Sequence, residues 1–406
     1  MQESVEAARS GGGAGPVRAT AAALSAVLVG IGLARFGYTP LIPALIAAHW
    51  FTPAAAVSLG AANLAGYLLG ALGARAIAAR AGLAPALRAM MVLTTASLFA
   101  CAFPLGFVWY FFWRVLSGLT GGGLMVLAAP AVLPGVPPSR RGLAGGAIFL
   151  GVGLGIAASG TLVPLLIKGG LVVTWFGLGL IALVLTALAW NGWPHEVRDH
   201  AEAAPRGGLL SPGAERALRA LYLEYALNAV GLVPHMVFLV DFIARGLGHG
   251  LAAGARDWVL LGIGALLGPL LAGHLGDRIG FRTALRLAFV VEAIAVAIPL
   301  ASTGAPALAL SSLVVGAFVP GIVAIVIGRT RELVPGDPHR QAAAWSWCTI
   351  AFALGMAIAA YGFAALYTLS ANGGALLFAL AAAALLLALA VDLGMASRVG
   401  RKLQGG

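Results

Sequence analysis

GFRTALR at residues 280–286 repeats the pattern of GLAPALR at residues 82–88, with an offset of 198 residues. A second pair of segments, PGVP at 134–137 and PGDP at 335–338, is separated by 201 residues. Each pair occupies the same place within its half of the 406-residue chain. A period near 200 residues therefore predicts two halves that share one fold and are related as parallel repeats.

The composition around these repeats is that of a membrane protein. Hydrophobic residues make up 61% of the chain, charged residues make up 10%, and the mean hydropathy is +0.97. A soluble domain has roughly 25% charged and 45–50% apolar residues, so this composition excludes a water-soluble globule. The long continuous apolar runs also argue against a membrane β-barrel, whose strands are short alternating segments.

The apolar runs predict an all-α polytopic membrane protein with twelve transmembrane helices in two pseudo-symmetric six-helix bundles. A spanning helix needs about 20 apolar residues. Helices are required because the bilayer core cannot satisfy backbone polar groups outside the segment. The predicted spans are residues 20–48, 54–79, 86–105, 107–132, 141–167, 171–193, 217–243, 256–275, 284–303, 306–330, 340–367 and 371–396.

The domain organisation follows from these spans and from one long polar stretch in the middle of the chain. The N-terminal segment lacks the basic region and short apolar region of a cleaved signal peptide, so the first span is expected to act as the membrane signal. The polar stretch is too short to hold a core of its own and is interpreted as a cytoplasmic linker. The predicted divisions are an N-terminal tail at 1–19, a bundle at 20–193, the linker at 194–216, a bundle at 217–396 and a tail at 397–406.

The basic residues predict the orientation of the chain. If the N-terminus is cytoplasmic, 20 of the 25 Lys and Arg residues fall in inner segments, three fall in outer loops, and Arg35 and Arg114 remain inside spans. This asymmetry predicts that both termini are cytoplasmic. The basic residues are scattered between apolar runs and form no face for a phosphate backbone, so no nucleic-acid partner is expected.

The sequence gives no sign of a disulfide, an enzyme or a metal site. Cys101 and Cys348 both lie inside apolar runs, where small buried thiols are common. The patterns HExxH, CxxC, GxSxG and GxxxxGK[ST] do not occur in the sequence. We therefore expect no catalytic residues, no metal and no cofactor.

The loop between spans 8 and 9 reads GHLGDRIGFR at residues 273–282. Glycine permits a sharp turn and close helix contact, and the carboxylate and guanidinium groups can form charge-assisted hydrogen bonds. This loop resembles the most recognisable motif of the major facilitator superfamily of secondary transporters, and the resemblance extends over the whole chain. It implies a gating motif that locks the two halves in one state, formed by Gly273, Asp277, Arg278, Gly280 and Arg282.

The equivalent loop of the first half departs from this motif. Arg80 occupies the position of Arg278, but Ala79 stands where the repeat has Asp277. Superfamily members usually keep the stronger copy in the N-terminal half. The missing aspartate puts a gating motif in the first half in doubt, but it does not affect the predicted fold.

Two further segments resemble branches of the superfamily. Span 5 carries Gly142, Gly151 and Gly155 at a spacing similar to the antiporter motif, although Ile156 replaces the expected proline. The signature of export is therefore partial. Residues 30–45, GIGLARFGYTPLIPAL, resemble the uncharacterised YbfB-like branch, which implies an inner-membrane transporter and names no substrate.

Two arginines lie inside predicted spans, where a charge costs about 2.5–3.5 kcal/mol. Arg35 lies about fifteen residues into span 1, roughly 22 Å along the helix. Arg114, followed by Gly118 and Gly122, resembles the superfamily pattern of span 4. Spans 1 and 4 line the cavity in this family, so Arg35, Arg114 and Tyr38 are candidate substrate-binding residues. An arginine recognises a carboxylate with two hydrogen bonds, whereas an ion pair or carbonyl clamp that fixes helix packing is the alternative role. For Arg114, a structural role or proton coupling is favoured over substrate binding.

Polar residues in the second half supply candidates for coupling and binding. Span 7 carries Glu224, Asn228 and His235, and span 9 carries Glu292. Glu224, His235 and Glu292 are candidate proton-coupling residues, because a membrane carboxyl group or imidazole can exchange a proton near neutral pH. Asn228 shares a helix face with Glu224, and Asn228 and His235 are also candidate substrate contacts. The alternatives are ion pairing of Glu224 with Arg219 or another basic group, and helix packing by His235 and Glu292.

The sequence thus predicts a secondary active transporter of a small organic solute that works by alternating access in the bacterial inner membrane. An anion is one candidate class of substrate. Proton coupling is the default expectation, and the glycine pattern of span 5 leans towards export. We expect a monomer whose partners are its substrate, protons and the lipid bilayer. A membrane-embedded sensor or a non-transporting binding protein is the alternative, and saturable flux in proteoliposomes discriminates between them.

Overall fold

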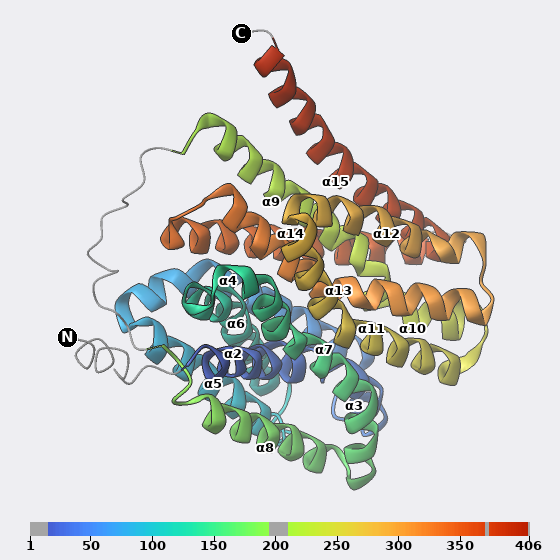
Figure 1. Ribbon diagram of the computed structural model, residues 1–406. Coiled ribbons are helices and arrows are strands. Elements are labelled where there is room, and N and C mark those ends of the chain that lie inside the picture. Colours follow the sequence, from blue (N-terminus) through green and yellow to red (C-terminus); the bar gives the residue numbers. More distant parts are fainter. Residues whose placement is uncertain (1–14, 195–209, 370–372, 405–406) are drawn as a thin grey trace.

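The apolar runs of the sequence fold into helices. The computed structural model describes residues 15–194, 210–369 and 373–404, and no strand occurs within these ranges. Figure 1 shows the long helices packed side by side. The N-terminal half comprises α2 (Pro16–Val27), η1 (Leu28–Phe36), η2 (Thr39–Leu41), α3 (Ile42–Ala47), α4 (Pro53–Ala81), α5 (Leu83–Ala100), α6 (Phe107–Val132), η3 (Leu133–Gly135), η4 (Pro138–Arg140), α7 (Arg141–Leu166), η5 (Ile167–Gly169) and α8 (Leu171–Ala189). The C-terminal half comprises α9 (Pro212–Val233), η7 (Pro234–Phe238), α10 (Leu239–Asp241), η8 (Phe242–Gly246), α11 (Gly250–Ile279), α12 (Phe281–Ala301), α13 (Ala305–Leu333), α14 (Pro338–Leu369) and α15 (Gly373–Gln404).

Eleven helical stretches in the described ranges are long and apolar enough to cross a membrane. The seventh predicted span, formed by α9, η7, α10 and η8, is not among them. It nevertheless packs against α14 and α15 inside the C-terminal half.

The predicted tails and linker are only partly described. Residues 1–14 of the N-terminal tail and residues 195–209 of the linker lie outside the described ranges. The remainder of the linker includes the first turn of α9, which Ser211 caps by accepting a hydrogen bond from the backbone of Ala214. α15 continues to Gln404 and therefore includes most of the segment predicted as a C-terminal tail.

The first and seventh predicted spans are interrupted helices. The first consists of α2, the π-helical η1, the short turn η2 and α3. The seventh contains two π-helical segments, of which η7 begins at Pro234. Proline lacks the backbone donor that a regular helix needs, and π-helical turns are frequent at functional sites. Arg35 lies in η1 and His235 lies in η7.

The repeat seen in the sequence has a structural counterpart at the turns between helices. Gly82 joins α4 to α5 with φ +86°, and Gly280 joins α11 to α12 with φ +81°. Residues with a side chain rarely adopt such a positive φ, so glycine is needed at both places. These two glycines are 198 residues apart, which is the offset of the surrounding segments. The two halves therefore share one fold.

Small residues bring helices of each half into close contact. A Cβ atom added to Gly118 on α6 would overlap the carbonyl oxygen of Asn63 on α4. The same holds in the second half, where a Cβ atom at Gly316 on α13 would overlap the carbonyl oxygen of Leu261 on α11. Such backbone approach replaces the hydrophobic driving force that is absent between helices in lipid.

We expect Gly118→Ala to destabilise the protein, because α4 and α6 must separate to admit the methyl group. Overpacking of this kind costs typically 1–3 kcal/mol. Gly73→Ala on α4 is the matched control, since its Cβ atom would meet only the flexible end of Ile77, at 3.8 Å. Thermal unfolding in detergent should show a lowered midpoint for Gly118→Ala and an unchanged or raised midpoint for Gly73→Ala. Equal midpoints would contradict this account of the α4–α6 contact.

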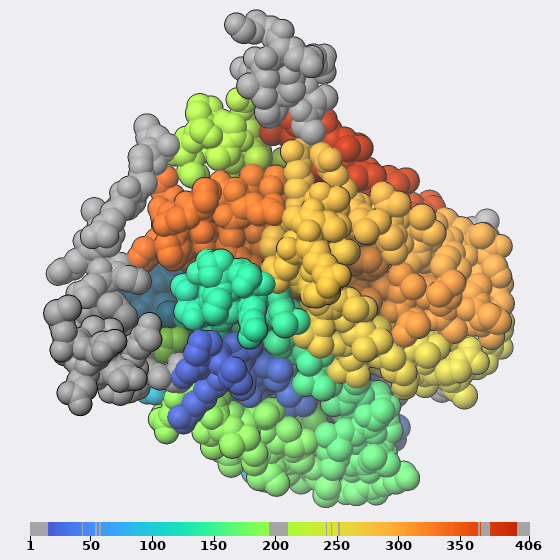
Figure 2. Space-filling view, viewed as in Figure 1, coloured from blue at the N-terminus to red at the C-terminus, as the bar shows by residue number. Residues whose placement is uncertain are grey.

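The two halves meet along two lines of helix contact. α7 of the first half packs against α11 and α13, and α4 and α6 pack against α14. Figure 2 shows the blue-to-green first half and the yellow-to-red second half on opposite sides of this boundary. The region between the halves is therefore bounded by helices from both.

α7 presents different glycines to its two neighbours. Gly155 lies against Gly32 of η1, within the first half, where a Cβ atom on Gly155 would overlap the Gly32 backbone. Gly153 faces α11 of the second half, where a Cβ atom would overlap the carbonyl oxygen of Ala265. The glycines of the partial antiporter pattern at positions 151 and 155 thus hold the first span against α7, and Gly153 belongs to the contact between the halves.

Candidate functional site

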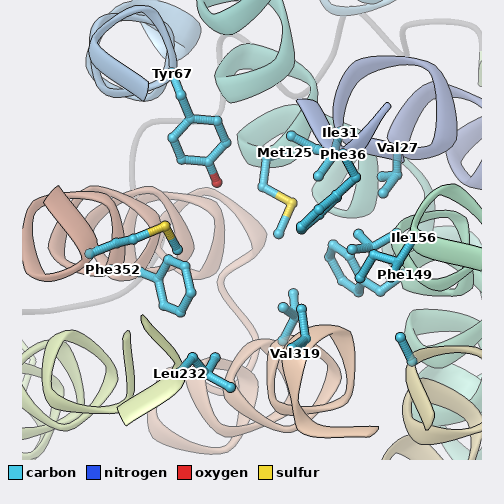
Figure 3. Close-up of a cluster of buried hydrophobic side chains, with 14 of the residues drawn as sticks. Val27, Ile31, Phe36, Tyr67, Met125, Phe149, Ile156, Leu232, Val319 and Phe352 are labelled. Carbon is cyan, nitrogen blue, oxygen red and sulfur yellow. The ribbon is translucent and has the colours of Figure 1, made fainter. Parts of the chain in front are cut away.

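Buried apolar side chains from both halves point towards a common region between them. Figure 3 shows these side chains on helices of both halves, with the hydroxyl group of Tyr67 directed towards the centre. They are buried in the core of the molecule. The labelled members are Val27, Ile31, Phe36, Tyr67, Met125, Phe149 and Ile156 from the first half, and Leu232, Val319 and Phe352 from the second. We call this set the central cluster.

Arg35 reaches from the first half to the second beside the central cluster. Its Nη2 atom donates to the sulfur of Met356 on α14, at 2.7 Å. The guanidinium carbon also lies 5.4 Å from the ring centroid of Phe36 and 5.6 Å from that of Tyr67. A thioether is a weak acceptor, and no ion pair within the described ranges includes Arg35.

The first half contains no acidic residue that could neutralise this charge. No Asp or Glu occurs between Glu6 and Glu196 in the sequence. Within the described ranges, the ion pairs of the protein all belong to the second half. A carboxylate that binds Arg35 therefore comes from outside residues 7–195 or from a ligand.

Arg114 lies in the interior of the first half and joins three helical segments. Its Nη1 atom donates to the carbonyl oxygen of Ala34, at 2.6 Å, and its guanidinium group lies 4.2 Å from the ring centroid of Tyr38. The Tyr38 hydroxyl donates to the carbonyl oxygen of Ala56, at 2.8 Å. The Nε atom of Arg114 is buried without a hydrogen-bond partner. This geometry is that of a clamp between α6, η1 and α4, which is the alternative role considered for Arg114.

Asn228 and Glu292 form a buried pair inside the second half. The Asn228 Nδ2 atom donates to Glu292 Oε2 at 2.7 Å, and both side chains are fully buried. The remaining oxygens, Oδ1 of Asn228 and Oε1 of Glu292, have no hydrogen-bond partner. Both of these oxygens are acceptors when the carboxyl group is ionised. Protonation of Glu292 would give the pair an additional hydrogen-bond donor.

His235 is also enclosed within the second half. Its Nε2 atom lies 2.8 Å from the hydroxyl oxygen of Ser311, which itself donates to the carbonyl oxygen of Ala295 at 2.7 Å. Because the serine hydrogen is used in the second bond, Nε2 of His235 is the donor in the first. Nδ1 has no partner, and the ring meets Phe378 edge-on. The structure thus connects His235 to its own bundle and to no residue of the central cluster.

Glu224 is buried on α9 with 3% of its surface exposed. No hydrogen bond or ion pair holds its carboxyl group within the described ranges, and Glu224 forms no ion pair with Arg219 there. An unpaired carboxyl group inside a membrane bundle is costly and is typical of proton pathways.

The gating motif connects the halves through Asp277. Its Oδ1 atom accepts from the backbone N–H of Gly142, and its Oδ2 atom accepts from that of Leu143, each at 3.1 Å. These two amides belong to the first turn of α7, where unpaired donors and the helix dipole favour a negative charge. Gly273 lies against Gly142 so closely that a Cβ atom would overlap its carbonyl oxygen. The motif therefore closes one end of the boundary between the halves, which we call the latched end.

The two arginines of the motif lie apart from this contact. Arg282 bonds to Asp392 on α15, at 3.1 Å, and Arg286 bonds to the same carboxylate. Arg278 is exposed at the end of α11. The motif thus divides into a latch formed by Gly273, Asp277 and the Gly280 turn, and an ion pair inside the second half.

Two residues that are not among the predicted site residues also link the halves. Met356 accepts the bond from Arg35, and Trp345 on α14 donates from Nε1 to the carbonyl oxygen of Met125 on α6, at 3.0 Å. A methionine within an apolar run carries no signal of such a contact. Trp345 is buried and packs against Phe149 of the central cluster, with ring centroids 5.9 Å apart.

The chain is similar to known transporters in sequence and in fold. The family model described as "Uncharacterised MFS-type transporter YbfB" matches residues 27–393. No curated protein matches the sequence. The crystal structure of the human organic anion transporter MFSD10 (TETRAN) is similar with a TM-score of 0.72 and 18% identity, over 93% of this chain and 99% of that chain. The outward-facing structure of a bacterial homologue of the iron transporter ferroportin is similar with a TM-score of 0.68 and 15% identity, over 94% of this chain and 99% of that one. At such identities the likeness concerns the fold.

Proposed function

Because this chain belongs to the YbfB-like family of major facilitator superfamily transporters, we propose that it carries a small organic anion through the centre between its halves. The observation that carries the proposal is the position of Arg35. This residue reaches across the boundary beside the central cluster, and its charge has no carboxylate partner there. Guanidinium binds a carboxylate with two parallel hydrogen bonds, so a substrate carboxylate supplies the partner that the first half lacks.

The central cluster indicates the rest of the substrate. Its side chains are aliphatic or aromatic, and the Tyr67 hydroxyl is the polar group that Figure 3 shows directed towards the centre. Binding sites of this kind take an apolar body and orient it through a few polar groups. We therefore infer an anion with an apolar or aromatic body. The description of MFSD10 as an organic anion transporter supports this substrate class.

We infer that transport proceeds by alternating access, with Asp277 holding the latched end shut in one of the two states. The positive-inside asymmetry favours a cytoplasmic position for this end and for both termini, and a bacterial inner membrane as the location. The partial glycine pattern on α7 favours export.

The experiment that tests the function combines binding with flux. A thermal-shift screen of purified protein against organic acids and their neutral amides should identify ligands, because binding to the folded state raises the unfolding temperature. The acids should stabilise and the matched amides should not. Ligands found in this way are then tested in proteoliposomes, where a transporter shows saturable flux. Saturable binding without flux would favour the sensor alternative, and stabilisation by the amides alone would exclude Arg35 as an anion site.

Proton coupling is assigned to the second half, with Glu224 as the first candidate and Glu292 as the second. Glu224 is buried and unpaired, and Glu292 is bonded to Asn228 with one oxygen unpartnered. Glutamine retains the size of the side chain but cannot exchange a proton. His235 is a third candidate whose bond to Ser311 favours a role in helix packing.

We expect Glu224→Gln to abolish substrate accumulation driven by a pH gradient while sparing exchange of substrate across the membrane. Glu215→Gln, at an exposed position in the first turn of the same helix, should behave as the native protein. Uptake and exchange in proteoliposomes with an imposed pH gradient measure both activities. If accumulation persists in Glu224→Gln but fails in Glu292→Gln, then Glu292 and not Glu224 is the proton-coupling residue.

A further inference from the structure

A second basic site lies at the latched end, in a cavity between the halves. The cavity has a volume of about 370 Å³ and is bounded by the end of α6, the start of α7, the end of α13 and the start of α14. Arg141 lines it from the first half, and Arg331 and Gln341 line it from the second. Trp345 forms part of its wall and also contacts Phe149, so this cavity and the central cluster lie against the same indole ring.

Arg331 contributes an unpartnered cation to this cavity. Its Nη1 and Nη2 atoms are buried and have no hydrogen-bond partner. Its guanidinium carbon lies 5.7 Å from the ring centroid of Phe281. The neighbouring carboxylates are engaged elsewhere, because Asp277 binds the first turn of α7 and Glu332 binds Arg329 and the backbone of Phe281.

Arg141 faces the same cavity from the other half and is held in place. Its Nε atom donates to the carbonyl oxygen of Val136 at 2.8 Å, and its Nη2 atom donates to that of Pro134 at 3.2 Å. Neither bond neutralises the charge. No Asp or Glu is among the residues that line the cavity.

We propose that this cavity binds a phosphate group, either free or in the headgroup of an anionic phospholipid. Buried guanidinium donors without acceptors are costly, and a tetrahedral oxyanion supplies acceptors to several of them at once. Because Arg141 and Arg331 belong to different halves, the bound anion connects them and stabilises the state in which the latched end is closed. The site is separate from Arg35 and goes beyond the proposed transport of an organic anion.

The test measures thermal unfolding of the purified full-length protein in uncharged detergent. Sodium phosphate is titrated against sodium chloride at constant ionic strength, and a second series compares nanodiscs of phosphatidylglycerol with nanodiscs of phosphatidylcholine. We expect a saturable rise of a few degrees in the unfolding temperature with phosphate, with phosphatidylglycerol, or with both. A rise with phosphate identifies the free ion as a ligand, and a rise confined to phosphatidylglycerol identifies the lipid.

The variants decide where the anion binds. Arg331→Met and Arg141→Met should each lose the rise, and Arg331→Lys should retain part of it, which controls for misfolding of the uncharged variant. Arg80→Met, at an exposed position at the end of α4, should keep the full rise. Arg35→Met should also keep it, which separates this site from the proposed substrate site. The proposal is overturned if neither series stabilises the native protein, or if Arg331→Met and Arg141→Met respond as the native protein does.

Discussion

Arg35→Met is expected to remove binding of the organic anion while leaving the protein folded. Charge-assisted hydrogen bonds contribute about 1.5–3 kcal/mol, so the loss should weaken binding by roughly 10- to 150-fold. The native contacts of Arg35 are a thioether and two aromatic rings, which an unbranched apolar side chain can also meet. Removing an uncompensated charge from the membrane interior should therefore leave the unfolding temperature unchanged or raise it.

Two further variants make this prediction specific. Arg35→Lys retains the charge but cannot form the two parallel hydrogen bonds, so its affinity should lie between those of the native protein and Arg35→Met. Arg75→Met removes a charge at an exposed position of α4 and should leave affinity intact. Affinity is measured by the thermal shift with a ligand from the screen and by the concentration dependence of flux. An affinity in Arg35→Met equal to the native value would refute the assignment.

Asp277→Asn is expected to shift the conformational equilibrium away from the state with the latched end closed. The carboxylate accepts two hydrogen bonds from the first turn of α7, and an amide can accept through one oxygen only. The change also removes a negative charge from a helix N-terminus, which is worth about 0.3–1 kcal/mol. Together with one charge-assisted bond of about 1.5–3 kcal/mol, these losses amount to a shift of more than tenfold in the equilibrium.

Distances between paired spin labels measure this shift. Labels at Ser139→Cys in η4 and His274→Cys in α11 lie at exposed positions on either side of the latch, and the native Cys101 and Cys348 are buried. The Asp277→Asn background should increase the population with a long distance. Asp337→Asn is the control, because Asp337 bonds to Arg340 within the second half. An unchanged distance distribution in Asp277→Asn would show that the α7 contact does not hold the halves together.

The fold could be predicted because few kinds of backbone structure can span a lipid bilayer. Apolar runs of spanning length must be helical, and the repeat at 82–88 and 280–286 divides them into two halves. The family match and the similar transporter structures confirm the predicted twelve-helix fold. The interruption of the first and seventh spans was not predicted, since π-helical turns depend on how neighbouring helices satisfy the backbone and not on hydropathy.

The site could be predicted only in part, because a residue's depth can be read from the sequence and its neighbours cannot. Arg35 and Arg114 are both charges inside spans, yet one contacts the other half and one bonds to a carbonyl oxygen of its own half. Asp277 stands in a recognisable motif, but the amides that it binds lie 135 and 134 residues away in the chain. Trp345 and Met356 are not among the predicted site residues, because their contacts depend on the packing of α14 against the first half.

Because residues 7–195 contain no Asp or Glu, the two halves differ in the ionisable groups that they can contribute. The described part of the first half carries arginines, one lysine and one histidine, His49, which lies on the loop before α4. The carboxyl groups of the helical bundles, and the buried histidine, belong to the second half. A chimera that joins this first half to the second half of a relative should therefore still bind an organic anion through Arg35 and acquire the pH response of the donor.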